Sequence, residues 1–271
     1  MSLIVSKALA KVNLALNITG KTSSGYHEMQ SIFAFLQDLY DELIFNTDRE
    51  FDEKAVVIPG VENNSILKAY TILRSNFDLK IPYVKIIKSI PICGGLGGGS
   101  SDAACFINTV FDYWGFTQKE KMTYIDIFRP LGADTKVFLF KYFTNSRFVY
   151  IDGTGLDGGI SNIDLQYINK YILIINDGTQ LSTSQVFENF NEPFCQNVSD
   201  PSQLLLYPHN SLQNSALELA PHLQDILDIF DNMSSIFYGI SGSGASCFAM
   251  LCNAQIDIKR IPYEHVILSS F

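Results

Sequence analysis

The sequence lacks the features that mark several common classes of protein. It has no apolar run approaching the ~18–20 residues of a membrane span, no internal repeat and no low-complexity tract. Basic residues are few: 19 Lys and Arg stand against 28 Asp and Glu, which gives a formal net charge of −9. An acidic chain has little long-range attraction for a polyanion such as DNA. We therefore expect no nucleic-acid partner and no membrane partner.

Cysteine and histidine are also scarce, and their spacing is poor for a disulfide framework or a metal site. The five cysteines include no C-x-x-C pair, and no histidine stands at a metal-ligand spacing. We expect buried free thiols, which are typical of a reducing compartment. Lys7 and Lys11 interrupt the apolar N-terminal stretch, which therefore lacks the core of a signal peptide. These observations predict a cytoplasmic protein.

Apolar residues make up 47% of the 271 residues, which is enough for a sizeable core. Between residues 10 and 18, apolar side chains occupy every second position, and this alternation predicts a half-buried strand. The other face opens with Lys11 and Asn13, two residues apart and therefore side by side. A cation and an amide placed in this way can reach a common ligand. The alternative is a solvated edge face.

Turn-forming residues at 21–25 precede Tyr26 and His27. An aromatic ring and an imidazole on the shoulder of a loop suit a planar ligand. Both residue types are also common at half-buried turn exits, so the motif alone leaves both interpretations open.

The strongest signal is a strand, a glycine loop and a helix between residues 84 and 114. Glycine occupies five of the six positions 94–99, and each glycine costs up to about 1 kcal/mol relative to Ala in regular structure. Without Cβ atoms, consecutive N–H groups can converge on a phosphate at the start of a helix. The sequence therefore predicts a loop that binds ATP, with a flexible connector as the alternative. Its residues are Pro91, Ile92, Cys93, Gly94, Gly95, Leu96, Gly97, Gly98, Gly99, Ser100 and Ser101.

Two common glycine-loop families do not fit this segment. A Walker A loop needs a Lys before its terminal Ser or Thr, where this chain has Gly99. A dinucleotide fingerprint needs a third glycine where this chain has Ser100.

The remainder of the chain alternates strands, helices and loops. Asp134 precedes an apolar run at 137–140, so its carboxylate could be a helix cap or a general base. Four glycines at 152–159 suggest a hinge or a domain boundary. We expect a strand at 171–175, a Ser/Thr-capped helix from 182, helical structure over 211–230, and a second glycine cluster at 239–249 between two strands.

Five motifs, taken in order, resemble those of the GHMP kinases, the superfamily of galactokinase, homoserine kinase and mevalonate kinase. They are AKVNL at 10–14, GYHE at 25–28, the loop at 91–101, LGAD at 131–134 and SGSGA at 241–245. The resemblance covers nearly the whole chain. It implies a mixed α/β (α+β) fold of two domains, with the active site in the cleft between them. We expect an ATP-binding and catalytic domain over 1–152 and a substrate-side domain over 153–271.

The resemblance also implies a reaction. The chain would transfer a phosphoryl group from ATP to the 2-hydroxyl of the methylerythritol unit of a cytidine-diphosphate conjugate, in non-mevalonate biosynthesis of isoprenoid precursors. The catalytic pair of the family falls on Asp134, as the base, and Lys11, as the charge stabiliser. Mg²⁺ is expected to accompany ATP, although no carboxylate cluster identifies its ligands.

The cytidine end of that substrate defines a second set of residues. The resemblance implies that the cytosine lies between aromatic rings and bonds the turn histidine, which indicates Tyr26, His27 and Phe187. Asn13 and Thr183 are the further polar contacts. Phe187 as an ordinary core residue is the alternative. For the whole chain, another GHMP small-molecule kinase or a non-catalytic nucleotide-binding sensor remains open, and the oligomeric state is not predicted.

Overall fold

The structure is a computed structural model that describes residues 2–56, 64–165, 171–233, 235–263 and 265–271. The chain packs as two compact units, each assembled from separate stretches of sequence. The first unit consists of Met1–Leu9, Tyr40–Ile90 and Gly98–Ser146. The second consists of Ala10–Leu39, Pro91–Gly97 and Arg147–Phe271.

Two long strands, β1 (Leu3–Lys21) and β2 (His27–Glu50), contribute residues to both units. Within the first unit, β2 pairs antiparallel with β3 (Pro82–Ile87), with Leu43 opposite Ile86. Within the second unit, β2 pairs antiparallel with β4 (Phe148–Ile151), and β4 pairs with β5 (Ile160–Asn162).

Residues 10–18 form a strand within β1, as predicted, but the expectation that it is half-buried is wrong. Lys11 and Asn13 are each 3% exposed, and Ala15 is 1% exposed, so the face expected to meet solvent is buried as well. Backbone from the two glycine segments covers this face, as described below. Simple alternation cannot distinguish a polar face in water from one covered by another part of the chain.

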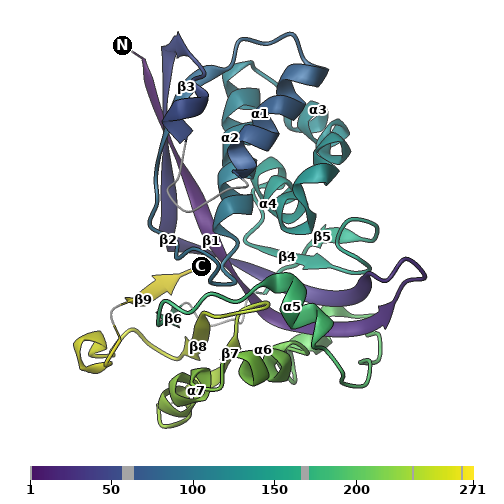
Figure 1. Ribbon diagram of the computed structural model, residues 1–271, viewed down its shortest axis with the longest axis vertical. Helices are drawn as coiled ribbons and strands as arrows, with labels where there is room; N and C mark the ends of the chain where they lie inside the picture. Colours follow the sequence, from purple (N-terminus) through teal and green to yellow (C-terminus); the bar gives the residue numbers. More distant parts are fainter. Residues whose placement is uncertain (1, 57–63, 166–170, 234, 264) are drawn as a thin grey trace. The chain divides into compact units, whose positions relative to one another are not determined.

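In the first unit, helix α2 packs against α1 and α4 (Figure 1). Most of α2 is buried, and rings from Phe77, Phe116 and Phe128 surround Phe111 on it. Gly115, at φ 76°, ends α2 where the sequence predicts a stop. The helical segments are α1 (Ser65–Asn76), α2 (Gly98–Tyr113), α3 (Gln118–Thr123), α4 (Ala133–Thr144), η1 (Glu53–Val56) and η2 (Ile125–Leu131).

In the second unit, a four-stranded antiparallel sheet has the order β7-β8-β6-β9. The strands are β6 (Tyr171–Asn176), β7 (Ser235–Ile240), β8 (Cys247–Leu251) and β9 (His265–Ser270). Leu173, Ile175 and Ala249 join Leu223 and Phe230 in one buried cluster, in which the helices supply apolar faces to the sheet. The helical segments are α5 (Thr183–Glu188), α6 (Gln213–Leu219), α7 (Leu223–Asp231), η3 (Pro201–Leu205) and η4 (Ile258–Arg260).

Two local expectations in this unit are modified by the structure. The periodic stretch at 211–230 forms two helices rather than one, because Pro221 lies between α6 and α7 and cannot continue a helix. Ser182 is the N-cap residue of α5, but its side chain does not cap the helix; its Oγ lies 2.9 Å from Ser184 Oγ instead.

Residues 152–159 form the turn of the hairpin that joins β4 to β5. Asp152 N donates to Gly159 O at 3.1 Å, and Thr154 N donates to Asp157 O at 3.0 Å. Gly153 takes φ 72° there, a conformation that favours glycine. The glycines expected at a hinge therefore close a hairpin within the second unit. The division of the family's domains at residue 152 stays a prediction.

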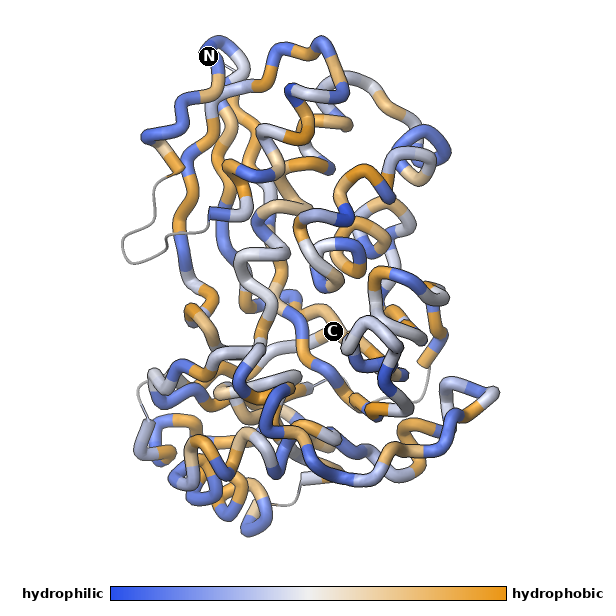
Figure 2. The backbone as a smooth tube through the Cα atoms, turned by 45° about the vertical axis from the view of Figure 1, so that its right-hand side comes forward, coloured by the Kyte–Doolittle hydropathy of each residue, from blue (hydrophilic) through white to orange (hydrophobic). Residues whose placement is uncertain are grey.

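All five cysteines are free thiols, as expected, but not all are buried. Cys105 and Cys247 are buried, whereas Cys93 and Cys252 are exposed. Figure 2 traces the apolar stretches, in orange, through the strands and helices of each unit. Over the part of the chain that the structure describes, no helix is both long and apolar enough to cross a membrane.

Candidate active site

Lys11, on β1, stands at the start of a buried chain of hydrogen bonds within the second unit. Its Nζ donates to Asn13 Oδ1 at 2.7 Å, and Asn13 Nδ2 donates to Ser31 Oγ at 2.9 Å. Ser31 Oγ in turn donates to Ala15 O at 2.7 Å. The Phe33 ring centroid lies 5.3 Å from Lys11 Nζ. A buried ammonium requires polar partners, and this chain of bonds fixes the direction of the lysine.

The two glycine segments hydrogen-bond to each other, and the first also bonds to β1. Ser246 N donates to Gly94 O at 3.0 Å, and Ser241 Oγ donates to Gly95 O at 3.0 Å. Lys11 N donates to Leu96 O at 3.0 Å. A Cβ added at Gly242 would lie 3.0 Å from Asn13 Oδ1 and 3.2 Å from Lys11 Nζ. The cation, the amide and both glycine segments thus meet at one place in the second unit.

This packing gives a different reason for two of the loop glycines. A Cβ added at Gly95 would lie 2.2 Å from Ser241 O, and one at Gly94 would lie 2.8 Å from Ser246 Oγ. Gly95 needs glycine because the backbone of the second glycine cluster approaches it, whereas Gly94 is crowded by the side chains of Ser246 and Asn176. At Gly99 the nearest atom to such a Cβ is Ser65 Oγ, at an ordinary 3.5 Å. Packing within the chain therefore does not account for glycine at this position. The close approach of a ligand would account for it.

Cys93 adopts φ 56°, in the left-handed region that favours glycine. The loop keeps its shape although one residue has a Cβ.

Helix α2 starts earlier than its apolar spacing predicts, because Gly98 and Gly99 form its first turn. Ser101, in the same turn, is fully buried, and its Oγ lies 3.4 Å from the Tyr142 hydroxyl. It therefore lies in the interior of the first unit, whereas Ser100 is partly exposed. The helix dipole places partial positive charge at this end of α2.

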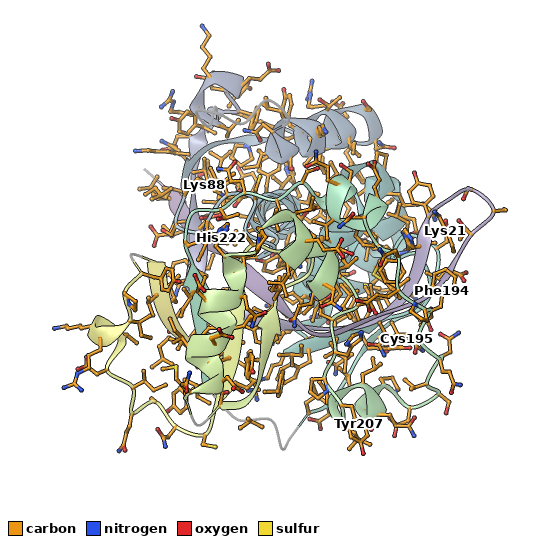
Figure 3. All side chains as sticks on the ribbon, turned by 60° about the horizontal axis from the view of Figure 1, so that its bottom comes forward. Lys21, Lys88, Phe194, Cys195, Tyr207 and His222 are labelled. Carbon is orange, nitrogen blue, oxygen red and sulfur yellow. The ribbon has the colours of Figure 1, made fainter. Side chains whose placement is uncertain are left out.

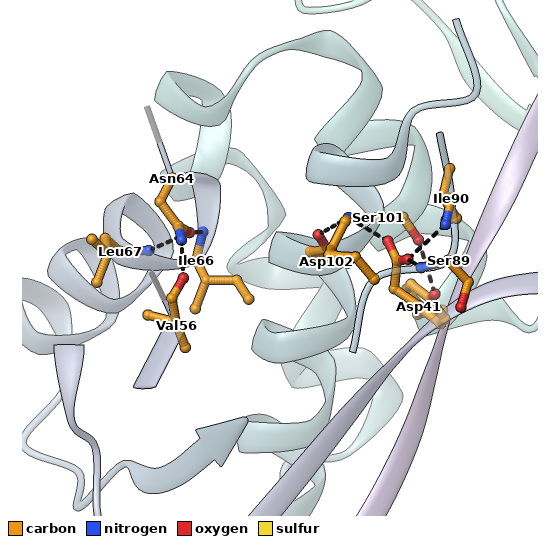
Figure 4. Close-up of polar contacts among 11 residues, drawn as sticks. Asp41, Val56, Asn64, Ile66, Leu67, Ser89, Ile90, Ser101 and Asp102 are labelled. Atoms are coloured by element: carbon orange, nitrogen blue, oxygen red, sulfur yellow. Dashed lines mark hydrogen bonds and ion pairs between the residues drawn. The ribbon is translucent and has the colours of Figure 1, made fainter. Parts of the chain in front are cut away.

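An ion-pair cluster within the first unit adjoins the same turn. Lys88 Nζ lies 2.6 Å from Asp102 Oδ2 and also pairs with Asp41. Asp41 is fully buried and accepts hydrogen bonds from Ser89 N at 2.5 Å and Ile90 N at 2.8 Å (Figure 4). Lys88 thus compensates the negative charge that Asp102 brings near the expected phosphate site. Burial raises the pKa of Asp102 to about 7, with Lys88 opposing the shift and Asp41 adding to it.

Asp134 lies in the first turn of α4 and is not its N-cap residue. That position belongs to Gly132, at φ 101°. The helix-cap interpretation of Asp134 is therefore wrong, and its carboxylate stands where a helix dipole favours negative charge. Lys136, two residues further on, pairs with Asp126 at 3.3 Å. Lys11 and Asp134 belong to different units, and their action as a pair stays a prediction.

The structure brings together the aromatic residues that the sequence places far apart. The His27 ring centroid lies 5.4 Å from that of Phe187, and the two planes are tilted by 30°. Tyr26, the residue before His27, is 65% exposed. Thr183 Oγ1 lies 3.0 Å from Ser243 Oγ, which links α5 to the second glycine cluster. Burial, and then the charge of Lys21, lower the pKa of His27, so the imidazole is neutral near pH 7.

Several residues near these groups were not predicted from the sequence. Phe190 meets His27 edge-on at 5.6 Å. Asn210 Nδ2 donates to both Ile240 O and Gly242 O at 2.8 Å, and so holds the second glycine cluster. Both residues come from the segment at 189–210, for which the family pattern predicts nothing. Figure 3 shows Phe194 and Cys195, from this segment, beside the hairpin that carries Lys21.

Comparison with known proteins agrees with the motifs. Residues 64–136 match the family model described as the GHMP kinases N terminal domain. A crystal structure of a 4-(cytidine 5′-diphospho)-2C-methyl-D-erythritol kinase superposes with a TM-score of 0.79 at 23% identity, covering 98% of each chain. Homoserine kinase from Cytophaga hutchinsonii gives a TM-score of 0.63 at 13% identity, covering 99% of this chain and 95% of that one. The mixed α/β fold is thus the GHMP kinase fold, as expected.

Curated relatives narrow the assignment further. The 4-diphosphocytidyl-2-C-methyl-D-erythritol kinase of Anaplasma phagocytophilum is 32% identical, over 92% of this chain and 86% of its own length. The enzyme of the same name from Ehrlichia canis is 30% identical, over 96% of this chain and 95% of its own length. The chain belongs to the 4-diphosphocytidyl-2-C-methyl-D-erythritol kinase family of non-mevalonate isoprenoid biosynthesis, and it is a kinase.

Proposed function

We propose that the chain transfers the γ-phosphoryl group of ATP to the 2-hydroxyl of 4-diphosphocytidyl-2-C-methyl-D-erythritol, giving the 2-phosphate and ADP. The observation that carries the proposal is the buried Lys11–Asn13 pair against two hydrogen-bonded glycine segments. This arrangement supplies a cation and backbone N–H groups for phosphate without a basic surface. The names of the relatives and the aromatic group at His27 support this choice of substrate.

The reaction forms a bond between the acceptor oxygen and the γ-phosphorus. It breaks the bond between that phosphorus and the oxygen bridging to the β-phosphate, so ADP leaves. Asp134 orients the hydroxyl and takes its proton, an acid–base contribution of roughly 10²–10⁴ in rate. Lys11 balances negative charge that spreads over the transferred group. Phosphoryl transfer depends mainly on such alignment and charge balance.

ATP and Mg²⁺ are the cofactors of the proposal. The open approach to Gly99 and the residues of the 91–101 loop fit a triphosphate. For Mg²⁺, the described residues contain no group of three or more His, Cys, Asp or Glu side chains able to hold a metal ion. Mg²⁺ commonly uses one or two carboxylates together with substrate phosphates and water. We infer that the ion arrives with ATP and is held largely by its phosphates.

At the cytidine end, Tyr26 and Phe187 offer rings for stacking, and His27 offers a neutral imidazole with one donor and one acceptor. Stacking on an aromatic ring is worth about 1–3 kcal/mol per base. Asn13 and Thr183 are further polar contacts of the substrate in this proposal.

The experiment is to measure ADP release from Mg-ATP with the cytidylylated acceptor and with a matched acceptor that lacks cytidine. Turnover confined to the first supports the proposal. Equal turnover of both acceptors would indicate another small-molecule kinase of the superfamily. ATP binding without ADP release would indicate a sensor that kept the fold and lost catalysis.

A further inference from the structure

The imidazole of His27 contacts two phenylalanine rings in different orientations. Phe187 lies near its face, with centroids 5.4 Å apart, and Phe190 meets it at 86° with centroids 5.6 Å apart. A ring contacted on its face and at its edge has little freedom to rotate, because any turn disrupts one of the contacts. The orientation of His27 therefore depends on both phenylalanines.

Phe190 is itself held firmly. It lies two residues beyond the end of α5, and its N–H donates to Phe187 O at 3.4 Å. Its other neighbour is Phe194, whose ring stacks on it at 6.3 Å with an interplanar angle of 19°. Asn189, the preceding residue, donates from Nδ2 to Glu218 Oε2 at 2.7 Å. Phe190 is thus supported by both the helix and the segment that follows.

That following segment is attached to the hairpin from which His27 extends. Cys195 N donates to Ile18 O at 2.8 Å. Val198 exchanges two hydrogen bonds of 2.8 Å with the Gln30 side chain, one through its N–H and one through its carbonyl. These bonds lie on both strands of the hairpin, so the phenylalanine and the histidine are fixed to one framework.

We propose that Phe190 is a positioning residue for the cytidine end of the substrate, and that it acts by holding the His27 imidazole in the plane in which it meets the base. The inference rests on the proposed function, because it assigns His27 to the base. Phe190 does not itself need to touch the substrate. It differs in this from Phe187, which offers its ring for stacking.

The electrostatics of His27 provide an independent readout. Charged residues on the neighbouring elements are Lys21 on β1, Glu28 on β2, Glu188 on α5 and Glu192 in the segment that follows. Burial is the larger cause of the lowered pKa of His27, and Lys21 is the second. Removing the Phe190 ring would expose the imidazole, so the pKa of His27 would rise toward its ordinary value of 6.5.

The test is Phe190→Leu in the full-length enzyme, assayed with the cytidylylated acceptor at saturating ATP. We expect KM for the acceptor to rise about tenfold, while kcat stays within about twofold. A tenfold change corresponds to the upper end of the free energy that one aromatic pair contributes. The pKa of His27, followed by NMR of its ring, should rise. Phe190→Tyr should restore both values. Tyr207→Leu is the control, since it removes an aromatic ring that is 87% exposed in the same unit, and it should leave both values unchanged.

The outcomes separate this inference from the proposed function. If the wild-type enzyme requires cytidine but Phe190→Leu changes neither KM nor the His27 pKa, the role of Phe190 is overturned and the reaction stands. If the wild-type enzyme accepts both acceptors equally, the proposed function itself fails. Should Phe190→Leu fold poorly by circular dichroism, Phe190→Met keeps the volume without the ring and is held to the same two readouts.

Discussion

Lys88 and Asp102 form an ion pair of 2.6 Å at the first turn of α2, and the second oxygen of that carboxylate, Oδ1, is buried without a hydrogen-bond partner. Asp102 is only 2% exposed. A buried carboxylate with one unsatisfied oxygen favours its protonated form. The pair joins the segment after β3 to the helix that starts at the glycine loop.

This arrangement predicts a pH dependence of stability. The pKa of Asp102 is raised in the folded state to about 7, above its ordinary value of 3.8. The folded state therefore binds more protons than the unfolded state between these values, and the group's contribution to the free energy of unfolding falls as pH rises from about 4 to 7. In Asp102→Asn this fall should be smaller, by at least about 1 kcal/mol. Urea unfolding of both proteins at pH 5.0 and 7.5 measures this fall. An equal fall in wild type and variant would contradict the prediction.

Asp134→Asn should keep ATP binding and lose turnover. The amide retains the size of the side chain but cannot accept the hydroxyl proton, so kcat should fall by roughly 10²–10⁴. Nucleotide titration by calorimetry and ADP release separate the two effects. Asp126→Asn, which removes the partner of Lys136 instead, is the matched control and should leave kcat within about twofold. A fully active Asp134→Asn enzyme would refute the assignment of the base.

Two glycine substitutions should have opposite effects. Gly95→Ala places a Cβ 2.2 Å from a backbone oxygen at φ 72°, so we expect a loss of about 3 kcal/mol in the free energy of unfolding. Gly99→Ala meets only ordinary contact, and alanine in a helix gains up to about 1 kcal/mol over glycine. It should fold well yet bind ATP more weakly. Thermal unfolding with and without ATP distinguishes the two, and equal losses of stability would contradict the reasoning.

Cys93→Gly should stabilise the protein by about 1 kcal/mol, because a residue with a Cβ in the left-handed region carries strain of that order. Cys93→Ala removes the thiol but keeps the Cβ, so its stability should stay within about 0.5 kcal/mol of wild type. Chemical denaturation of the three proteins under reducing conditions is the measurement. Equal stabilisation by both variants would assign the effect to the thiol rather than to the backbone.

The sequence could indicate candidate site residues where the pattern is local. Lys11 and Asn13 are neighbours on one strand, and the glycine loop is continuous. The sequence could not reveal which long-range packing each feature serves. Strand alternation at Lys11 did not show the backbone that covers it, and the glycines at 94 and 95 are required by Ser246 and Ser241, about 150 positions away. No sequence pattern marked Phe190, because its proposed role depends on its distance from His27 in space.

The hydrogen bond from Ser241 to Gly95 spans 146 positions of the chain. A ribosome makes the chain from its N-terminus. Residues 91–97 therefore leave it long before β7, the second glycine cluster and β8, which hold them in the folded protein. During that interval the segment has the entropy of a glycine-rich coil and lacks the partners that Ser241 and Ser246 supply. Nucleotide affinity should therefore arise late in synthesis, as a property of the nearly complete chain rather than of its first half.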